Sequence, residues 1–162
     1  MAQPSLASMI VPIGSLLLIR SIDTEDPEIQ TYIQIVFVAV HSVIVAALLY
    51  LRLKITGKND ETMIDVVAPA VPFQPEEEKG KVRKMTVVEY DLEQWNELAF
   101  KKIGMALCII AFMHIKLGHI VPLLFQSFHN PQQVYGSPLF KIYAMAREAV
   151  GENARPFAVA NP

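Results

Sequence analysis

A run of 20 uncharged residues, YIQIVFVAVHSVIVAALLYL from Tyr32 to Leu51, constrains this chain more than any other feature. At 1.5 Å per residue, a helix of about 20 residues crosses a hydrocarbon core of about 30 Å. A chain of 162 residues is too short to bury so apolar a helix on all sides. We therefore predict a transmembrane helix over this run.

Both ends of this predicted helix carry boundary signals. Asp26 can accept hydrogen bonds from the first turn, Pro27 suits the first helical position, and Glu28 complements the helix dipole. At the other end a cluster of bases follows the interfacial residue Tyr50. The sequence therefore predicts a helix that begins near Pro27 and leaves the membrane after Leu51.

A shorter apolar segment precedes this helix, from Leu6 to Ile19. It has 14 residues and contains Pro12 and Gly14, so it covers about 21 Å and falls short of a full crossing. A thin or tilted span is one interpretation. A cleaved signal peptide is the other, although its base, Arg20, follows the apolar stretch instead of preceding it.

A third apolar segment runs from Ile103 to Phe128. It is uncharged as far as Ile115, is then interrupted by Lys116, and contains Pro122, which would kink a helix. We expect a third membrane helix that does not face lipid all round.

The polar stretch between the second and third segments contains nine Lys or Arg residues, whereas the short loop at 21–28 holds four acids and no base. Cytoplasmic loops carry the excess of bases, so we expect residues 52–102 to face the cytosol. The candidate cytosolic or interfacial contacts are Arg52, Lys54, Lys58, Trp95, Lys101 and Lys102.

Two short strands are expected in this cytosolic stretch, at 62–67 and 85–90, because both are rich in β-branched and aromatic residues. Asp91, with Gln94 three positions later, resembles a capping box and predicts the start of the next helix. Near the C-terminus, Ser137 and Pro138 predict the start of an amphipathic helix that ends at Gly151. Docking on other helices and lying on the membrane surface are both open for this helix.

The predicted fold class is therefore a mainly α integral membrane protein with about three membrane helices, a small cytosolic β-hairpin and a C-terminal amphipathic helix. Four regions follow along the chain: membrane helices one and two at 1–54, the cytosolic loop with hairpin and helix start at 55–98, the third membrane helix at 99–128, and the C-terminal loop and amphipathic helix at 129–162.

Composition and motifs exclude several classes of function. The net charge of −2 argues against a nucleic-acid binder that depends on phosphate neutralisation. Cys108 is the single cysteine, so neither an internal disulfide nor a cysteine-rich zinc site can form. No nucleotide-binding, hydrolase or metalloprotease motif is found, and we expect no enzyme activity, cofactor or metal.

The candidate site is a polar membrane groove formed by His114, Lys116, His119 and Gln126 in the third segment. Lys116, His119 and Gln126 share one face of a continuous helix, and polar groups at membrane depth are costly unless they face protein or water. The alternative is that Lys116 only marks the interface, with its ammonium group reaching the head groups. His41, a lone imidazole in the apolar run, fits an internal hydrogen bond better than metal binding.

Several short sequences resemble a fungal endoplasmic reticulum membrane family, described both as an inorganic phosphate transport protein and as the third component of the SND pathway. In chain order they are Arg20-Ser21-Ile22-Asp23, Glu25-Asp26-Pro27, Tyr32-Ile33, Lys58-Asn59-Asp60, Tyr90-Asp91-Leu92, Gly104-Met105-Ala106, Phe112-Met113-His114, Pro122-Leu123, Gln126-Ser127 and Arg155-Pro156-Phe157. The resemblance implies a multi-pass ER membrane factor that targets and inserts client membrane proteins independently of the signal recognition particle (SRP), beside the Sec translocon.

The implied partners are the Sec translocon, other SND components, client transmembrane segments and the lipid bilayer, with the ribosome as a further candidate. Two alternatives stay open at this point. The family name suggests phosphate transport, for which one intramembrane lysine offers little positive charge. A structural subunit of a larger ER membrane complex is the other.

Overall fold

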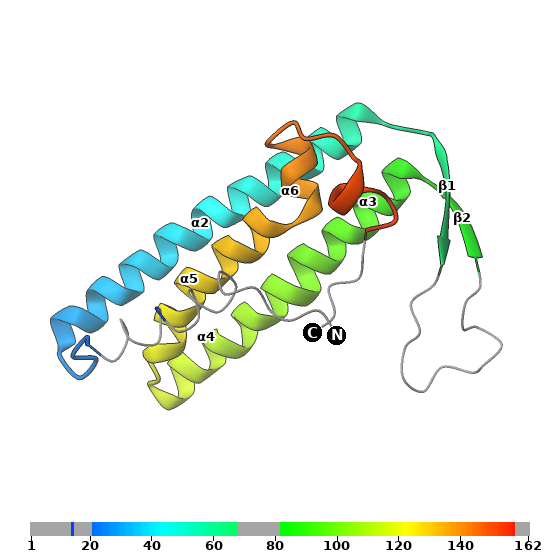
Figure 1. The fold of residues 1–162 in the computed structure, drawn as a ribbon. Coiled ribbons are helices and arrows are strands. Elements are labelled where there is room, and N and C mark those ends of the chain that lie inside the picture. The colour runs from blue at the N-terminus through cyan, green and yellow to red at the C-terminus, as the bar shows by residue number, and fades with distance from the viewer. Residues whose placement is uncertain (1–13, 15–20, 68–81, 158–162) are drawn as a thin grey trace. The chain divides into compact units, whose positions relative to one another are not determined.

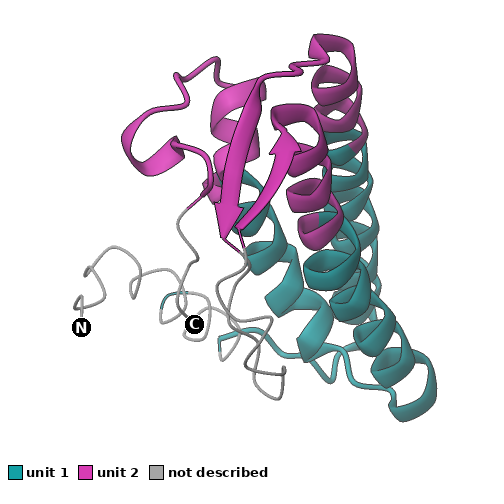
Figure 2. Cartoon of the chain, turned by 90° about the vertical axis from the view of Figure 1, so that its right-hand side faces the viewer, with its two compact units in different colours: residues 1–48, 99–135 teal, residues 49–98, 136–162 magenta. Residues whose placement is uncertain are grey.

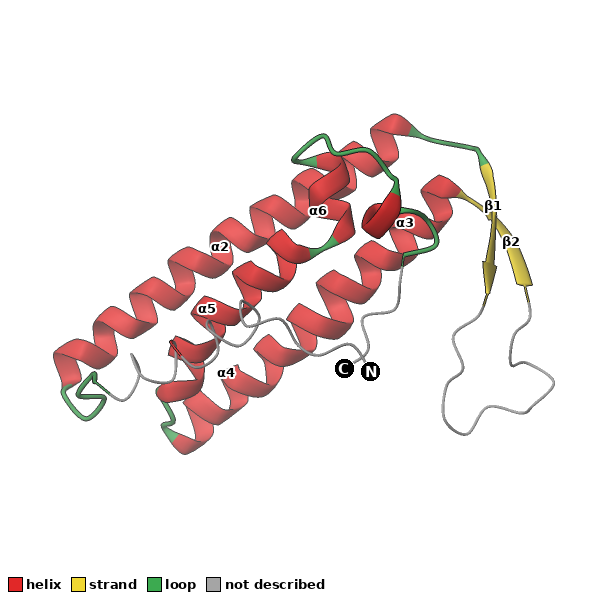
Figure 3. Ribbon diagram, viewed as in Figure 1, coloured by secondary structure: helices red, strands yellow, loops and turns green. Residues whose placement is uncertain are grey.

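The structure is a computed structural model that describes residue 14 and residues 21–67 and 82–157. Most of the described residues are helical, and one hairpin among them contributes two strands (Figures 1 and 3). The elements are α2 (Pro27–Lys58), β1 (Met63–Val67), β2 (Val82–Thr86), α3 (Val87–Asn96), the π-helix η2 (Glu97–Gly104), α4 (Met105–Leu117), α5 (Val121–Gly136), α6 (Pro138–Tyr143) and the 3-10 helix η3 (Gly151–Asn153). The predicted first apolar segment, 6–19, lies outside the described residues except for Gly14, which is helical.

Helix α2 begins where the sequence predicts. The backbone N–H of Glu28 donates to Oδ1 of Asp26 at 2.8 Å, and Pro27 occupies the first helical position. The 32-residue helix continues past the apolar run through Arg52 and Lys54 to Lys58.

Two helical stretches in the described chain are long and apolar enough to cross a membrane: α2, and the continuous stretch Val87–Leu117 formed by α3, η2 and α4. Only 22% and 17% of their most apolar windows are buried. Large apolar side chains such as Val43 and Ile115 are 70% and 74% exposed. A soluble protein would hide such surface, so these faces are suited to lipid.

The hairpin forms, but its second strand is shifted from the predicted position. The strands pair antiparallel from Met63 opposite Thr86 to Val67 opposite Val82. The predicted strand at 85–90 is wrong after Thr86, because Thr86 Oγ1 accepts the N–H of Glu89 while the Glu89 carboxylate accepts the N–H of Thr86. This capping box places the N-cap of α3 at Thr86, five residues before the predicted cap at Asp91.

The third apolar segment is two helices and not one. Helix α4 ends at Leu117 because Gly118 adopts a left-handed conformation with φ of 70°, which glycine tolerates at a helix C-cap. Helix α5 begins at Val121 and extends through Pro131, where a loop was predicted. Further on, α6 begins at Pro138 as predicted, with Ser137 as its N-cap, but it ends at Tyr143, well before Gly151.

The chain divides into two compact units (Figure 2). Unit 1 comprises 1–48 and 99–135, and unit 2 comprises 49–98 and 136–162. The core of unit 1 joins α2, α4 and α5 through Ile33, Ile110, Leu123 and Leu124. In unit 2, Val66 and Met85 on the hairpin pack against Tyr90 of α3, with Phe157 beside them.

Candidate functional site

A largely apolar groove of about 290 Å³ lies in unit 1, on the segments of α2, α4 and α5 that belong to it. Its apolar lining residues are Phe37, Val38, Ile110, Ala111, Ile115 and Leu123. Val38 and Ile115 are 63% and 74% exposed, so the groove is open at the surface.

The groove also contains one polar pair, made by Gln34 of α2 and His114 of α4. His114 Nδ1 lies 3.2 Å from the backbone oxygen of His119, which can only accept, so this nitrogen carries the proton. His114 Nε2 is then the acceptor for the side-chain N–H of Gln34, at 3.2 Å. A groove that is otherwise apolar therefore contains an amide hydrogen-bonded to an imidazole.

The four residues of the predicted polar groove are not gathered on one helix face. The break at Gly118 separates Lys116, on α4, from His119, in the connection, and from Gln126, on α5. Lys116 is exposed and makes no hydrogen bond or ion pair with any described residue. The side-chain oxygen of Gln126 is buried and accepts no hydrogen bond within the described chain. Only His114 lines the groove.

His41 forms an internal hydrogen-bonded pair, as its position predicted, and the partner is Asn130 of α5, which sequence analysis missed. His41 Nδ1 donates to the Phe37 oxygen at 2.7 Å, and its Nε2 accepts from Asn130 at 3.0 Å. Both side chains are buried in unit 1. Polar residues recurring on α5 at Gln126 and Asn130 were the available signal. In residues 21–67 and 82–157, no three His, Cys, Asp or Glu side chains are placed to hold a metal ion.

The predicted cytosolic contacts have mixed surroundings. In unit 2, the Arg52 guanidinium lies 4.9 Å from the centre of the Trp95 ring, and Lys54 lies 5.4 Å from that of Tyr50. Trp95 is only 4% exposed, so it does not lie free at a membrane surface as predicted. Lys58 pairs with Asp60 at 3.6 Å. Lys101 and Lys102, on η2 in unit 1, are exposed.

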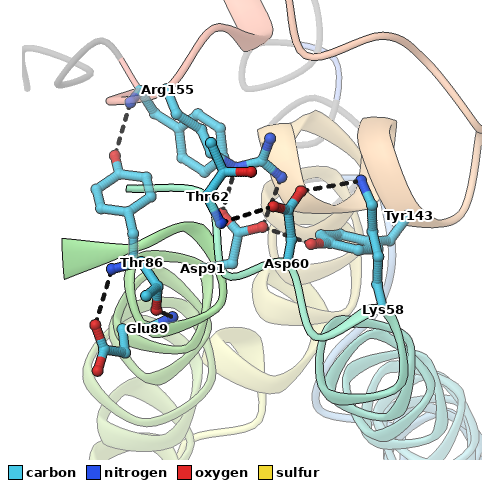
Figure 4. A network of polar contacts seen from close by, with 10 residues as sticks. Lys58, Asp60, Thr62, Thr86, Glu89, Asp91, Tyr143 and Arg155 are labelled. Carbon is cyan, nitrogen blue, oxygen red and sulfur yellow. Dashed lines mark hydrogen bonds and ion pairs between the residues drawn. The ribbon is translucent and has the colours of Figure 1, made fainter. Parts of the chain in front are cut away.

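A buried polar cluster in unit 2 was missed by sequence analysis (Figure 4). The Asp91 side chain is fully buried, and it accepts hydrogen bonds from Arg155 Nε at 2.7 Å and from the Arg155 terminal nitrogen at 2.6 Å. The hydroxyl of Tyr143 donates to the same carboxylate at 2.6 Å. The N–H of Phe157 donates to the Tyr90 hydroxyl at 2.7 Å. We call these five residues the C-terminal clasp.

The surroundings of the clasp shift the pKa of Arg155 and of Tyr143. Burial lowers the pKa of Arg155, but the hydrogen bonds and charge of Asp91 outweigh it and raise the pKa above its usual value. Burial and the bond to Asp91 raise the pKa of the Tyr143 hydroxyl. At the edge of this region, hydrogen bonds from Thr62 lower the pKa of Asp60.

Comparison with known proteins gives consistent matches over nearly the whole chain. A family model described as phosphate transport (Pho88) matches residues 2–162. The chain is 32% identical to SRP-independent targeting protein 3 of Saccharomyces cerevisiae over 95% of this chain and 80% of that protein. It is 29% identical to the Schizosaccharomyces pombe SRP-independent targeting protein 3 homolog, over 95% of this chain and 78% of that protein. An uncharacterized S. pombe protein is 31% identical over 93% of this chain and 74% of its own length. No solved structure matches.

Proposed function

This chain belongs to the Pho88 family, and from that premise we propose that it is an ER membrane factor that targets and inserts client membrane proteins independently of SRP. The observation that carries the proposal is the similarity to two proteins named for SRP-independent targeting, over nearly the full chain. The two long apolar helices with exposed faces fit a factor that works in a membrane. The role is non-enzymatic.

The groove of unit 1 is the proposed contact site for a client helix. Its exposed wall residues Val38 and Ile115 offer apolar surface to a hydrophobic segment. The Gln34 amide, held by His114, offers hydrogen-bonding groups to a polar side chain of the client, whose transfer into hydrocarbon without a partner is costly. We propose that further polar groups lie outside the groove, on Lys116, His119 and Gln126.

The proposed topology is multi-pass, with the stretch 52–102 in the cytosol. Four regions are proposed, at 1–54, 55–98, 99–128 and 129–162, as the sequence suggests. Arg52, Lys54, Lys58, Lys101 and Lys102 would meet partners or anionic head groups at the cytosolic surface. The proposed partners are the Sec translocon, other SND components, client segments and the ribosome.

Site-specific photocrosslinking tests the client site. A photoreactive residue at Ile115 should capture a ribosome-bound client whose transmembrane segment has just emerged. The matched control is Phe112, which is 60% exposed on the same helix but does not line the groove. Equal capture at the two positions, or none at Ile115, would contradict the groove as the client site.

The polar residues outside the groove need a separate test. Lys116→Leu together with His119→Leu should leave the protein in the membrane but lower insertion of clients that require this pathway, because both changes remove polar groups at membrane depth. Lys116→Arg keeps the charge and should be milder. Normal insertion by the double variant would mean that Lys116 only marks the membrane interface.

The family description favours phosphate transport as the second candidate function. Phosphate is bound by clustered cations or backbone N–H groups, yet within unit 2 the Arg155 side chain is already ion-paired with Asp91, and Arg83 pairs with Glu93 at 2.9 Å. Uptake of labelled phosphate by proteoliposomes containing the purified chain tests this candidate. A structural subunit role predicts neither uptake nor client crosslinks.

A further inference from the structure

The last described residues bind to the rest of unit 2 much as a short peptide motif binds to a protein. Arg155 supplies a charged anchor, and Phe157 supplies an aromatic anchor two residues later. The Phe157 ring lies edge-on to Tyr90 with 5.3 Å between ring centres, and its N–H donates to the Tyr90 hydroxyl. Residues 154–157 form neither helix nor strand, so side-chain recognition holds them in place.

The receiving site is built mainly by α3, with help from α6 and the hairpin. Asp91 has no exposed side-chain surface and Arg155 only 8%, which makes this a desolvated, bidentate ion pair. Tyr143 fixes the second carboxylate oxygen, and Met85 and Val66 provide the apolar floor beneath Phe157 (Figure 4 for the polar side). The site therefore selects an arginine followed two residues later by an aromatic residue.

The connection between α6 and this segment contains one regular element, a 3-10 turn. Opening the connection therefore disrupts little secondary structure. It runs from Ala144 to Ala154, and Arg147, Glu148 and Val150 on it are exposed. Ala146 has a φ of 53°, a left-handed conformation that is unfavourable for a residue with a side chain. Fully extended, these residues span about 36 Å, so the segment can reach a neighbouring molecule.

We propose that the clasp is exchangeable between molecules: the Arg155–Phe157 segment of one copy enters the Tyr90–Asp91–Tyr143 site of a second copy, and the exchange is reciprocal. The occupant is a second copy, because its segment makes the same contacts as the chain's own segment. Exchange of an identical element is a low-cost route to a dimer, and opening of the connection can relieve the left-handed backbone of Ala146. This proposal does not depend on the proposed targeting function.

Complementation between two full-length variants tests the exchange. Arg155→Ala retains an intact site, and Asp91→Ala retains an intact segment, so one exchanged pair between them restores a complete Asp91–Arg155 contact. Co-expressed with different tags and solubilised in mild detergent, they should co-purify several-fold more than a control in which Arg155→Ala is replaced by the double variant Asp91→Ala/Arg155→Ala. Co-purification at the control level would overturn the proposal.

Disulfide crosslinking is a second measurement. It leaves the Asp91–Arg155 ion pair intact and therefore does not depend on the folding of the Asp91→Ala and Arg155→Ala variants. In a Cys108→Ser background, one copy carries Met85→Cys and the other Phe157→Cys, so a disulfide between the two copies requires exchange. Covalent dimers from the mixed copies, and none from either copy alone with a Cys-free partner, would support it. Absence of dimers would overturn it.

Binding of a synthetic labelled peptide that spans residues 152–160 distinguishes exchange between copies from recognition of the motif without exchange. If Arg155→Ala binds this peptide, and a peptide with glutamine in place of the arginine fails to bind, while copies neither co-purify nor crosslink, the site recognises the motif but copies of the chain do not exchange it. That result would overturn a second copy as the occupant.

Discussion

At the scale of single residues, Asp91 shows why local sequence patterns mislead. Its position before Gln94 suits an N-cap, and nothing nearby along the chain indicates burial. Its actual partners, Tyr143 and Arg155, are 52 and 64 residues away. A buried carboxylate needs such partners because desolvation penalises its charge, but only the folded chain brings them together.

The ion pair predicts an asymmetric response to mutation. Asp91→Ala leaves the Arg155 guanidinium buried and unpaired, and should destabilise unit 2 by about 3–5 kcal/mol. The double variant Asp91→Leu/Arg155→Leu replaces both charges with apolar groups and should lose much less. Thermal unfolding in detergent measures both. Arg83→Ala breaks the exposed pair with Glu93 and is the control, with an expected loss below about 1 kcal/mol.

Asp60 predicts a pH dependence of stability. Hydrogen bonds from Thr62, and then the charge of Lys58, lower its folded pKa below the unfolded value. Its stabilisation is therefore fully present above the unfolded pKa and is lost as the pH falls through the folded pKa. Asp60→Asn should cost less than about 1 kcal/mol at pH 7 and nothing at pH values well below about 4. Unfolding curves between pH 3 and 7 check this, with Asp65→Asn as the exposed control; a pH-independent difference would contradict it.

The candidate site was only partly accessible from sequence. His114 was predicted as a site residue because it is a polar residue within an apolar run, and it does line the groove. Its partner Gln34 lies 80 positions earlier, on another helix, and no local pattern links the two. The grouping of Lys116 with His119 failed because it assumed a continuous helix across Gly118.

At the scale of elements, β2 passes directly into α3 at Thr86. The residues from Thr86 to Tyr90 are β-branched, aromatic or acidic, so strand propensity and a capping box compete for them. The capping box prevails because Thr86 and Glu89 satisfy each other's backbone N–H groups. The signal was present in the sequence as Thr-x-x-Glu.

This boundary gives a prediction for helix α3. Thr86→Ala removes the hydroxyl that accepts the Glu89 N–H and should destabilise the start of the helix by about 1 kcal/mol. Hydrogen exchange at the Glu89 amide should quicken. Thr56→Ala is a suitable control, because the Thr56 hydroxyl donates within α2 to the oxygen of Arg52 and caps no helix N-terminus. Equal effects of the two substitutions on the Glu89 amide would argue against the cap.

At the scale of the whole molecule, hydropathy was the most informative property. The apolar run at 32–51 predicted α2 because a long uncharged stretch needs no knowledge of tertiary contacts. The division into two units could not be predicted in the same way. Both units draw on α2 and on the stretch from α3 to α4, so their boundaries fall inside continuous helices that carry no linker signal.

The membrane role of α2 gives a prediction that involves the entire chain. Ala46 lies exposed in the apolar run, and Ala46→Asp should raise the free energy of membrane insertion by about 2.5–3.5 kcal/mol. The matched control is Ala144→Asp, at an exposed position just after α6. Carbonate extraction and steady-state abundance measure the effect. If both variants remain equally abundant and membrane-bound, Ala46 does not face lipid.

The two long helical stretches also differ in the thickness of hydrocarbon that their uncharged runs can span. The uncharged run of α2 has 20 residues, whereas the uncharged stretch between Lys102 and Lys116, Ile103 to Ile115, has 13. At 1.5 Å per residue these correspond to about 30 Å and about 20 Å. In the proposed multi-pass topology, the shorter run is accommodated by thinning of the bilayer beside α4 or by Lys102 and Lys116 reaching to the head groups, at a cost that grows with bilayer thickness. Thin membranes are therefore the energetically cheaper surroundings for this chain.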